Sequence, residues 1–412
     1  MSATPTSTPE SGPGGGPAAE DHVGRRIAVQ RKLADLTQQR LADQIGYSVS
    51  LLGQVEQGAK PATPALIAAV TRALHLEYGV LTGQPNMRLL REDHLNALVT
   101  PIRDALDLFD LGVAEGQPRP RAANVLSVIA EDQCRLVRAG QIRQVAQILP
   151  ALIEETTAAA YLAPTSGDTL AWSVLGSVYR TAYDVVTKLG YQDLAALALD
   201  RMAWAGERAG DPILAGLRQY MRSLVLLRGG RYATGQRLVT AGLALIGQAD
   251  NLLERTAITG QLHLGAAVLA ARSGDRDGAL GHLDVAERAA ATTGEVPKLR
   301  WVSFGPVNVG AHRVAALSEL KDYAAAVAAA DELRIPADWA PSRRGRHHVE
   351  VAYARLWTGD KDGSLNHLRA ARTVAPQQTR YDPIVQETVT ALLRAQRSTP
   401  DTLANMAAWV GV

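Results

Sequence analysis

A duplicated segment in the C-terminal half of the chain constrains the fold most strongly. Residues 274–290 (GDRDGALGHLDVAERAA) and 359–375 (GDKDGSLNHLRAARTVA) are identical at nine of 17 positions, at an offset of 85 residues. Looser copies of this turn-then-helix pattern begin at Gly190, Gly230 and Lys321, so successive starts lie 40, 44, 47 and 38 residues apart. This spacing corresponds to one helix pair per repeat, and such units stack to bury their apolar faces. We therefore predict an α-solenoid.

The composition of the chain favours helices throughout. Of 412 residues, 47% are hydrophobic but only 5% are aromatic, and alanine and leucine dominate, which suits close helix packing better than strands. We expect an all-α protein with at least two domains. A single cysteine, Cys134, excludes a disulfide framework. The N-terminus lacks a signal pattern and no apolar run of membrane length occurs, so we expect a cytoplasmic protein that does not enter a membrane.

A second pattern occupies residues 38–57 (QQRLADQIGYSVSLLGQVEQ) and fits the 20-position template of two helices joined by a tight turn. Ala42 is small enough to let the two helices approach closely, and Gly46 supplies the left-handed conformation that turns the chain. Four apolar residues fall where they would hold the crossing angle of the helices: Leu41, Ile45, Leu52 and Val55.

The same window carries the run Thr37-Gln38-x-x-Leu41-Ala42 before the turn and Glu56-x-Gly58 after the second helix. With these motifs, residues 22–76 resemble the five-helix, lambda-repressor-like helix-turn-helix domain of the Xre family. The resemblance implies binding of double-stranded DNA, with the second helix of the motif in the major groove. It also implies that Arg31 and Glu56 form an internal ion pair.

Roles in DNA binding follow from this resemblance, position by position. Gln38 corresponds to a phosphate-contacting glutamine, Tyr47 and Lys60 to backbone contacts, and Gln54 to a side chain that bonds adenine. Because residues 48–50 are short and weakly polar, shape readout is expected to contribute. The predicted DNA-binding residues are Gln38, Gln39, Tyr47, Ser48, Val49, Ser50, Gln54 and Lys60.

After the helix-turn-helix segment, which we call the head, the repeats resemble tetratricopeptide-type repeats. The whole architecture resembles Gram-positive regulators that sense exported peptides. Alanine and arginine content is typical of an actinobacterial source. The resemblance implies that the concave surface binds a peptide or small-molecule signal. The least repeat-like stretch, 298–313, predicts a ligand pocket together with the next repeat; the alternative is an aromatic core between imperfect repeats. The pocket residues are Trp301, Phe304, Asn308, His312, Arg343, Arg344 and His347.

No pattern in the chain predicts catalysis, a cofactor or a metal site. Asp275-x-Asp277-Gly278 and its copy at 360–363 lack the further ligands of a calcium loop, so we interpret both as turns with aspartate as helix N-cap. His282 and His367 occupy equivalent repeat positions and are interpreted as packing residues. His347 and His348 are adjacent on a predicted helix and point about 100 degrees apart, which suits a metal poorly.

The predicted layout is a disordered tail at 1–20, a DNA-binding domain at 21–80, a linker at 81–87 and a repeat domain for sensing and dimerisation at 88–412. One helix-turn-helix unit covers only a half-site, so a symmetric operator requires a homodimer. The first functional hypothesis is therefore a ligand-responsive transcription regulator. The alternative is a protein-interaction scaffold or adaptor whose head binds DNA weakly and without sequence preference.

Overall fold

A computed structural model of the chain describes residues 22–74, 76, 81, 92–113, 116, 118–163, 169–296, 299–380, 382–395 and 401–412. These residues are helical apart from turns and one isolated antiparallel bridge between Val296 and Phe304. The predicted all-α class is confirmed. The predicted tail, the linker beyond Leu81 and the fifth head helix lie outside the described residues, whereas Leu81 itself packs in the core of the head.

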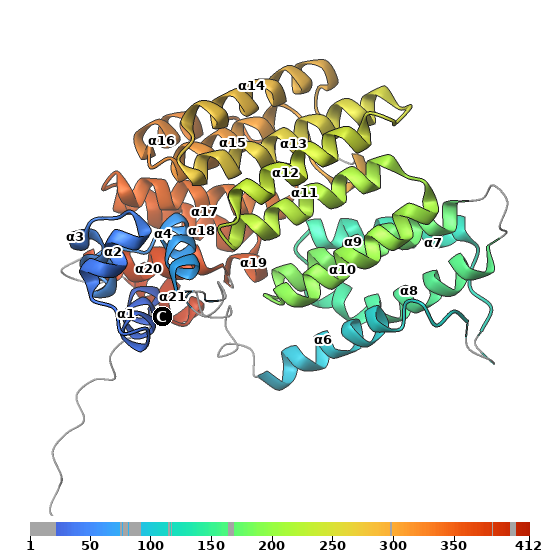
Figure 1. Ribbon diagram of the computed structural model, residues 1–412, viewed down its shortest axis with the longest axis horizontal. Coiled ribbons are helices and arrows are strands. Elements are labelled where there is room, and N and C mark those ends of the chain that lie inside the picture. The colour runs from blue at the N-terminus through green and yellow to red at the C-terminus, as the bar shows by residue number, and fades with distance from the viewer. Residues whose placement is uncertain are drawn as a thin grey trace, which may run out of the picture.

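The first four helices form the N-terminal head, and a long helical region follows it (Figure 1). The head helices are α1 (Val23–Leu33), α2 (Gln38–Ile45), α3 (Val49–Glu56) and α4 (Pro64–Ala73). The helical region begins with α6 (Glu92–Asp107), α7 (Ala123–Arg138) and α8 (Ile142–Leu162).

Five antiparallel helix pairs come next. They are α9 (Leu170–Lys188) with α10 (Gln192–Ala209), α11 (Pro212–Arg228) with α12 (Tyr232–Ile246), α13 (Leu252–Ser273) with α14 (Arg276–Thr293), α15 (Pro306–Glu319) with α16 (Tyr323–Glu332), and α17 (Pro341–Trp357) with α18 (Lys361–Val374). The short 3-10 helix η1 (Leu299–Trp301) lies between α14 and α15, and the chain ends with α19 (Pro376–Arg380), α20 (Pro383–Ala395) and α21 (Asp401–Val410). Among the described residues, no helix is both long and apolar enough to cross a bilayer.

Each repeat start predicted from the sequence is the turn between the two helices of a pair. The turns at Gly190, Gly230, Gly274 and Gly359 have positive φ angles, and Lys321 adopts the same conformation at the α15–α16 turn. Asp275 and Asp360 cap α14 and α18 by accepting hydrogen bonds from the N–H groups three residues on, at 2.8 Å in both cases. The interpretation of the Asp-x-Asp-Gly segments as capped turns is confirmed.

Two histidines contact each other between α13 and α14, and two more do so at the equivalent positions between α17 and α18. Nδ1 of His263 lies 2.9 Å from Nδ1 of His282, and His348 lies 3.1 Å from His367 in the same way. Both pairs obey the 85-residue offset. The sequence identified the equivalence of His282 and His367 only, because His263 and His348 lie outside the duplicated segments.

Neighbouring helices approach more closely than side chains of ordinary size allow. A Cβ atom placed on Gly176 of α9 would lie 2.4 Å from Leu214 of α11, and one on Gly216 of α11 would lie 2.2 Å from Ile246 of α12. Gly345 of α17 meets the side chain of Ala375 in the same manner. A larger residue at these positions would force its neighbour to shift, so these glycines allow the close packing of the helices.

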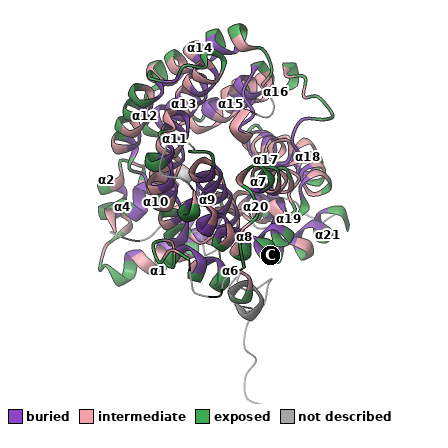
Figure 2. Ribbon diagram, turned by 90° about the vertical axis from the view of Figure 1, so that its right-hand side faces the viewer, coloured by how far each residue is buried: buried purple, intermediate pink, exposed green. Residues whose placement is uncertain are grey.

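The stack curves until its late helices meet its early ones. Figure 2 shows α9, α11, α13, α15 and α17 on the inner side of this curve, with their partners outside. Helix α17 contacts α7. Lys188 at the end of α9 donates to Oε1 of Gln378 in α19 at 3.0 Å. Arg138 of α7 donates to Oγ of Ser303 at 2.7 Å, and Arg180 of α9 donates to the carbonyl of Trp301 at 2.9 Å. The helical region therefore closes on itself.

The head docks along the turn edge of this curved stack (Figure 1). The Arg72 guanidinium lies 5.4 Å from the ring centroid of Tyr232, just after the α11–α12 turn, and the Lys321 ammonium of the α15–α16 turn lies 4.6 Å from that of Tyr47.

At helix α20, Glu387 accepts a hydrogen bond from the main-chain N–H of Val23 at 3.2 Å. Val23 opens α1, so this carboxylate also meets the positive end of the helix dipole. Arg394 of the same helix donates to the carbonyl of Gly58. The head is thus held by the α11–α12 and α15–α16 turns and by helix α20, elements far apart in the chain.

We predict that folding stability falls as the pH drops from about 6.5 to 4. Burial lowers the pKa of both His312 and His347 to about 4, against about 6.5 in an unfolded chain. In this pH window the unfolded chain binds more protons than the folded chain, so the stability present at pH 7 is lost on acidification. Urea unfolding at pH 7.5, 6 and 5 measures the effect.

His347→Gln should reduce the pH slope of the unfolding free energy by close to one proton. Gln248→Ala, at an exposed site without a titratable group, is the control that should leave the slope unchanged. An unfolding free energy that stays constant over this window contradicts the prediction.

Candidate nucleic-acid interface

The two helices of the motif begin and end where their capping residues dictate. The Thr37 hydroxyl accepts from the N–H of Arg40 at 3.1 Å and starts α2, and the Ser48 hydroxyl accepts from the N–H of Leu51 at 3.2 Å and starts α3. Between them Gly46, with a φ of 71°, ends α2 in the left-handed conformation. The chain therefore reverses direction within three residues.

Packing then fixes the crossing of the two helices. The residues assigned to this role in the sequence are part of the core of the head: Leu41, Ala42, Leu52 and Val55 are fully buried, and Ile45 packs against them. The close approach at Ala42 and the turn at Gly46 agree with the template. Helix α3 is held as a rigid unit on the rest of the head.

A buried carboxylate ties three helices of the head together. Glu56 of α3 accepts from Nε and Nη2 of Arg31 in α1 at 2.7 and 2.9 Å. Its second oxygen also accepts from the amide of Gln38 in α2 at 2.7 Å. Arg31 uses its remaining nitrogen for the carbonyl of Leu36 at 2.7 Å. The hydrogen bond to Glu56 raises the pKa of Arg31, and the predicted internal ion pair is confirmed.

The residues predicted to contact DNA fall into two groups. Gln39, Ser48, Ser50 and Lys60 are exposed, while Gln38, Val49 and Gln54 are half-buried. Gln38 lies beside Gly53, so the start of α2 and the middle of α3 are neighbours. Apart from Lys60 in the following turn, these residues come from the start of α2 and from α3, and form the surface we term the α3 face.

Two of the predicted residues have other roles in this structure. The side-chain amide of Gln38 is bound to Glu56, which leaves the amino end of α2 rather than this amide for a phosphate. Tyr47 points toward the helical region, where Lys321 covers its ring and burial raises the pKa of its phenol. Of the eight, Tyr47 is thus placed on the docking side of the head.

The side-chain carbonyl of Gln54 is a buried acceptor with no hydrogen-bond partner among the described residues. A buried polar atom without a partner costs free energy, so this amide is not held in place by the head itself.

Residues 22–81 match the family model of a helix-turn-helix domain. The head is a helix-turn-helix domain. Neither the curated proteins nor the solved structures include one that matches the chain. From the family match, the head is an N-terminal DNA-binding domain of the helix-turn-helix type, and the closed helical region described above follows it.

The predicted ligand pocket is divided between core and inner surface. Phe304 is fully buried in the core of α13–α15, where its ring takes the space beside Gly260, and His347 is buried as well. Asn308 is buried and donates to Gln261 at 3.2 Å, and its carbonyl lies 2.8 Å from Nδ1 of His312.

The main-chain carbonyl of Trp301 accepts from Arg138 and Arg180, while Nε of Arg344 is buried without a described partner. Ser342, the neighbour of Arg343, is linked through Gln378 to Lys188 of α9, and the charge of Arg343 lowers the pKa of both Lys188 and Arg138. Trp301 and Arg343 are thus members of this set that lie toward other helices of the curve. Among the described residues, no group of three or more histidine, cysteine, aspartate or glutamate side chains is arranged to hold a metal ion.

We predict that Arg31→Met destabilises the head by about 3 to 5 kcal/mol, because it leaves the Glu56 carboxylate buried without its cation. The double variant Arg31→Met/Glu56→Leu should recover most of this loss. Denaturant unfolding, followed in parallel with DNA binding, measures both. Arg40→Met, at an exposed site on α2, is the control, and equal unfolding free energies for the single and double variants would refute the role given to the pair.

Proposed function

We propose that the protein is a sequence-specific transcription regulator of the Xre type whose helical region is a tetratricopeptide-like solenoid that binds a signal and pairs two heads. The observation that carries the proposal is the orientation of the helix-turn-helix domain. On its α3 face Gln39, Ser48 and Ser50 are exposed and the other residues half-buried, whereas another side of the head is docked on the helical region through Tyr47, Val23 and Gly58.

In this proposal, the α3 face enters the major groove. Ser48 and Ser50 approach from the start of α3, Val49 contacts a thymine methyl, and the unpartnered amide of Gln54 bonds N6 and N7 of adenine. Lys60, in the turn after α3, neutralises a phosphate. Few polar side chains on this face can read bases, so sequence-dependent DNA shape adds to specificity.

Docking of the head suggests how a signal would act on DNA binding. The contacts at Tyr232, Lys321 and Glu387 belong to elements separated by dozens of residues in a stack where each unit touches mainly its neighbours. A ligand on the inner side that changes the curvature displaces these elements relative to one another. The head then turns or loosens, and in a homodimer the distance between the two α3 faces changes.

The short side chains at 48–50 favour one alternative function. If this face carries no base preference, the protein is an interaction scaffold or adaptor with a non-specific head, and its affinity for DNA comes from phosphates alone.

Selection of binding sites from random DNA with the full chain, followed by footprinting, tests the proposal. We expect two half-sites related by a dyad and about 10 base pairs apart, or a multiple of this distance. Gln54→Ala should cost about 1 to 3 kcal/mol on the selected site and much less on unrelated DNA. Lys60→Ala should weaken binding to all sequences alike and reduce the salt slope by about one.

Gln248→Ala, an exposed change in the helical region, is the control for both variants. Binding that shows no sequence enrichment, with Gln54→Ala equal to the unchanged chain on every DNA, supports the scaffold and contradicts the regulator.

A further inference from the structure

Cationic side chains from four helices converge on the inner side of the curve. Arg138 comes from α7, Lys188 from α9, Arg228 from α11 and Arg343 from α17, and α9, α11 and α17 line the inner side of the curve (Figure 2). Contacts place three of these residues close together. Arg138 donates to the same carbonyl of Trp301 as Arg180 of α9, and Gln378 links Lys188 to Ser342, the neighbour of Arg343. In agreement with this arrangement, the charges of Arg343 and Arg228 both lower the pKa of Lys188, and that of Arg343 lowers the pKa of Arg138. We refer to these four residues as the cation cluster.

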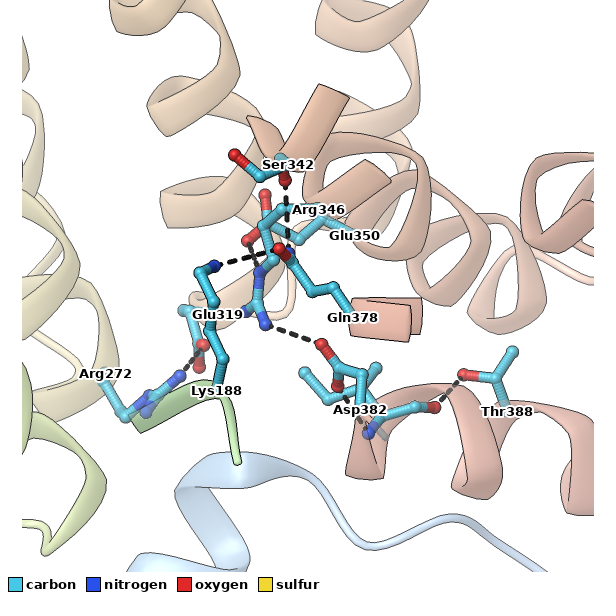
Figure 3. Close-up of polar contacts among 10 residues, drawn as sticks. Lys188, Arg272, Glu319, Ser342, Arg346, Glu350, Gln378, Asp382 and Thr388 are labelled. Carbon is cyan, nitrogen blue, oxygen red and sulfur yellow. Dashed lines mark hydrogen bonds and ion pairs between the residues drawn. The ribbon is translucent and has the colours of Figure 1, made fainter. Parts of the chain in front are cut away.

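Few carboxylates balance this charge. Asp184, on the same face of α9 as Lys188, approaches the cluster and also lies 3.9 Å from Arg180. Figure 3 shows that the nearby Arg346 is already paired, because it donates to Glu350 at 2.7 Å and to Asp382 at 3.1 Å. Burial and the neighbouring cations bring the pKa of Lys188 down to about 8 and that of Arg138 to about 10. The cluster therefore holds more positive charge than its surroundings neutralise.

Hydrogen-bond donors in the same region also lack acceptors. Nη1 of Arg228, Nε of Arg180 and the hydroxyl of Thr187 are buried, and none has a hydrogen-bond partner among the described residues. The main-chain N–H of Arg343 donates to the carbonyl of Ala340, but its guanidinium makes no hydrogen bond to a described residue. Buried donors without acceptors are rare in folded proteins and require an explanation. A ligand group with several acceptor oxygens and a negative charge would accept hydrogen bonds from these donors and neutralise the excess positive charge.

We propose that the cation cluster binds an oxyanion, the phosphate or carboxylate group of a small molecule or of a peptide. Arginine presents a planar pair of donors to such a group, and Lys188 supplies a point charge from the opposite helix. The proposal deepens the proposed function by giving the chemistry of its signal, and it rests on that function only for the effect on DNA.

The position of the cluster connects it to the head. Lys188 bonds to Gln378, whose amide in turn donates to the carbonyl of Ser342 at 3.2 Å, one residue before Arg343 (Figure 3). This chain of contacts joins α9 to α17 and α19 where the curve closes, next to the helix α20 that holds the head. An anion between Lys188 and Arg343 draws these elements together and tightens the closure.

Thermal unfolding and calorimetric titration of the full chain test the proposal, with inorganic pyrophosphate and citrate as probes and sodium chloride at matched ionic strength as reference. We expect at least one probe to bind and to raise the unfolding temperature above that in chloride. Stabilisation by pyrophosphate alone identifies a phosphate ligand, stabilisation by citrate alone identifies a carboxylate ligand, and stabilisation by both supports the oxyanion site.

Arg343→Met should reduce probe affinity at least tenfold, and without a probe it should raise the unfolding temperature because it relieves repulsion. Arg343→Lys should keep part of the affinity. Arg369→Met, at an exposed site on α18, is the matched control and should bind like the unchanged chain. The proposal is overturned if neither probe exceeds chloride, or if Arg343→Met binds the probes as well as the unchanged chain.

The two proposals fail in different ways. A probe that binds through Arg343 but leaves DNA affinity unchanged supports the oxyanion site and contradicts its role as a signal site. Dyad-specific DNA binding by a chain that binds neither probe supports the regulator and overturns the oxyanion site.

Discussion

The curvature of the helical region depends on small residues at the contacts between helices. Where Gly176 meets Leu214 and Gly216 meets Ile246, one of the two helices contributes no side chain to the contact, so the helices pack closely. Repeated through the stack, this close packing brings α17 against α7. Closure then determines both the inner side, where the cation cluster lies, and the turn edge, where the head docks.

The head depends on a different kind of interaction. Glu56 is buried, and its charge is acceptable because Arg31 and Gln38 supply three hydrogen bonds from two other helices. The arrangement positions α3 but does not make the head independent of the rest of the chain. Glu387 and Arg394 bond to its main chain from a helix more than 300 residues further on, so the orientation of the α3 face is set by the helical region.

The sequence predicted those parts of the structure that rest on local signals. Gly46 and the aspartates at 275 and 360 act within three or four residues, so these turns and caps could be placed from the chain alone. The ion pair of Arg31 with Glu56 was predicted from the resemblance to the Xre family, not from the spacing of the two residues.

Long-range contacts left no such signal. Nothing near Tyr47 in the sequence distinguishes a phosphate contact from a ring covered by Lys321, because the partner is 274 positions away. Phe304 and Asn308 suit a pocket as well as a core, and only packing decided that Phe304 belongs to the core. Lys188, Arg138 and Arg228 were missed as candidates because each is an ordinary residue of its own repeat, and they form a cluster only after the curve closes.

The central claim is that the helical region holds the helix-turn-helix domain in a defined orientation. Hydrogen exchange of the first turn of α1, measured in the full chain and in the Arg394→Ala variant, tests this claim most directly. The claim predicts slow exchange in the unchanged chain and clearly faster exchange in the variant, with exchange in α13 unaltered. Equal exchange of α1 in the two proteins would show that the docked arrangement does not restrain the head.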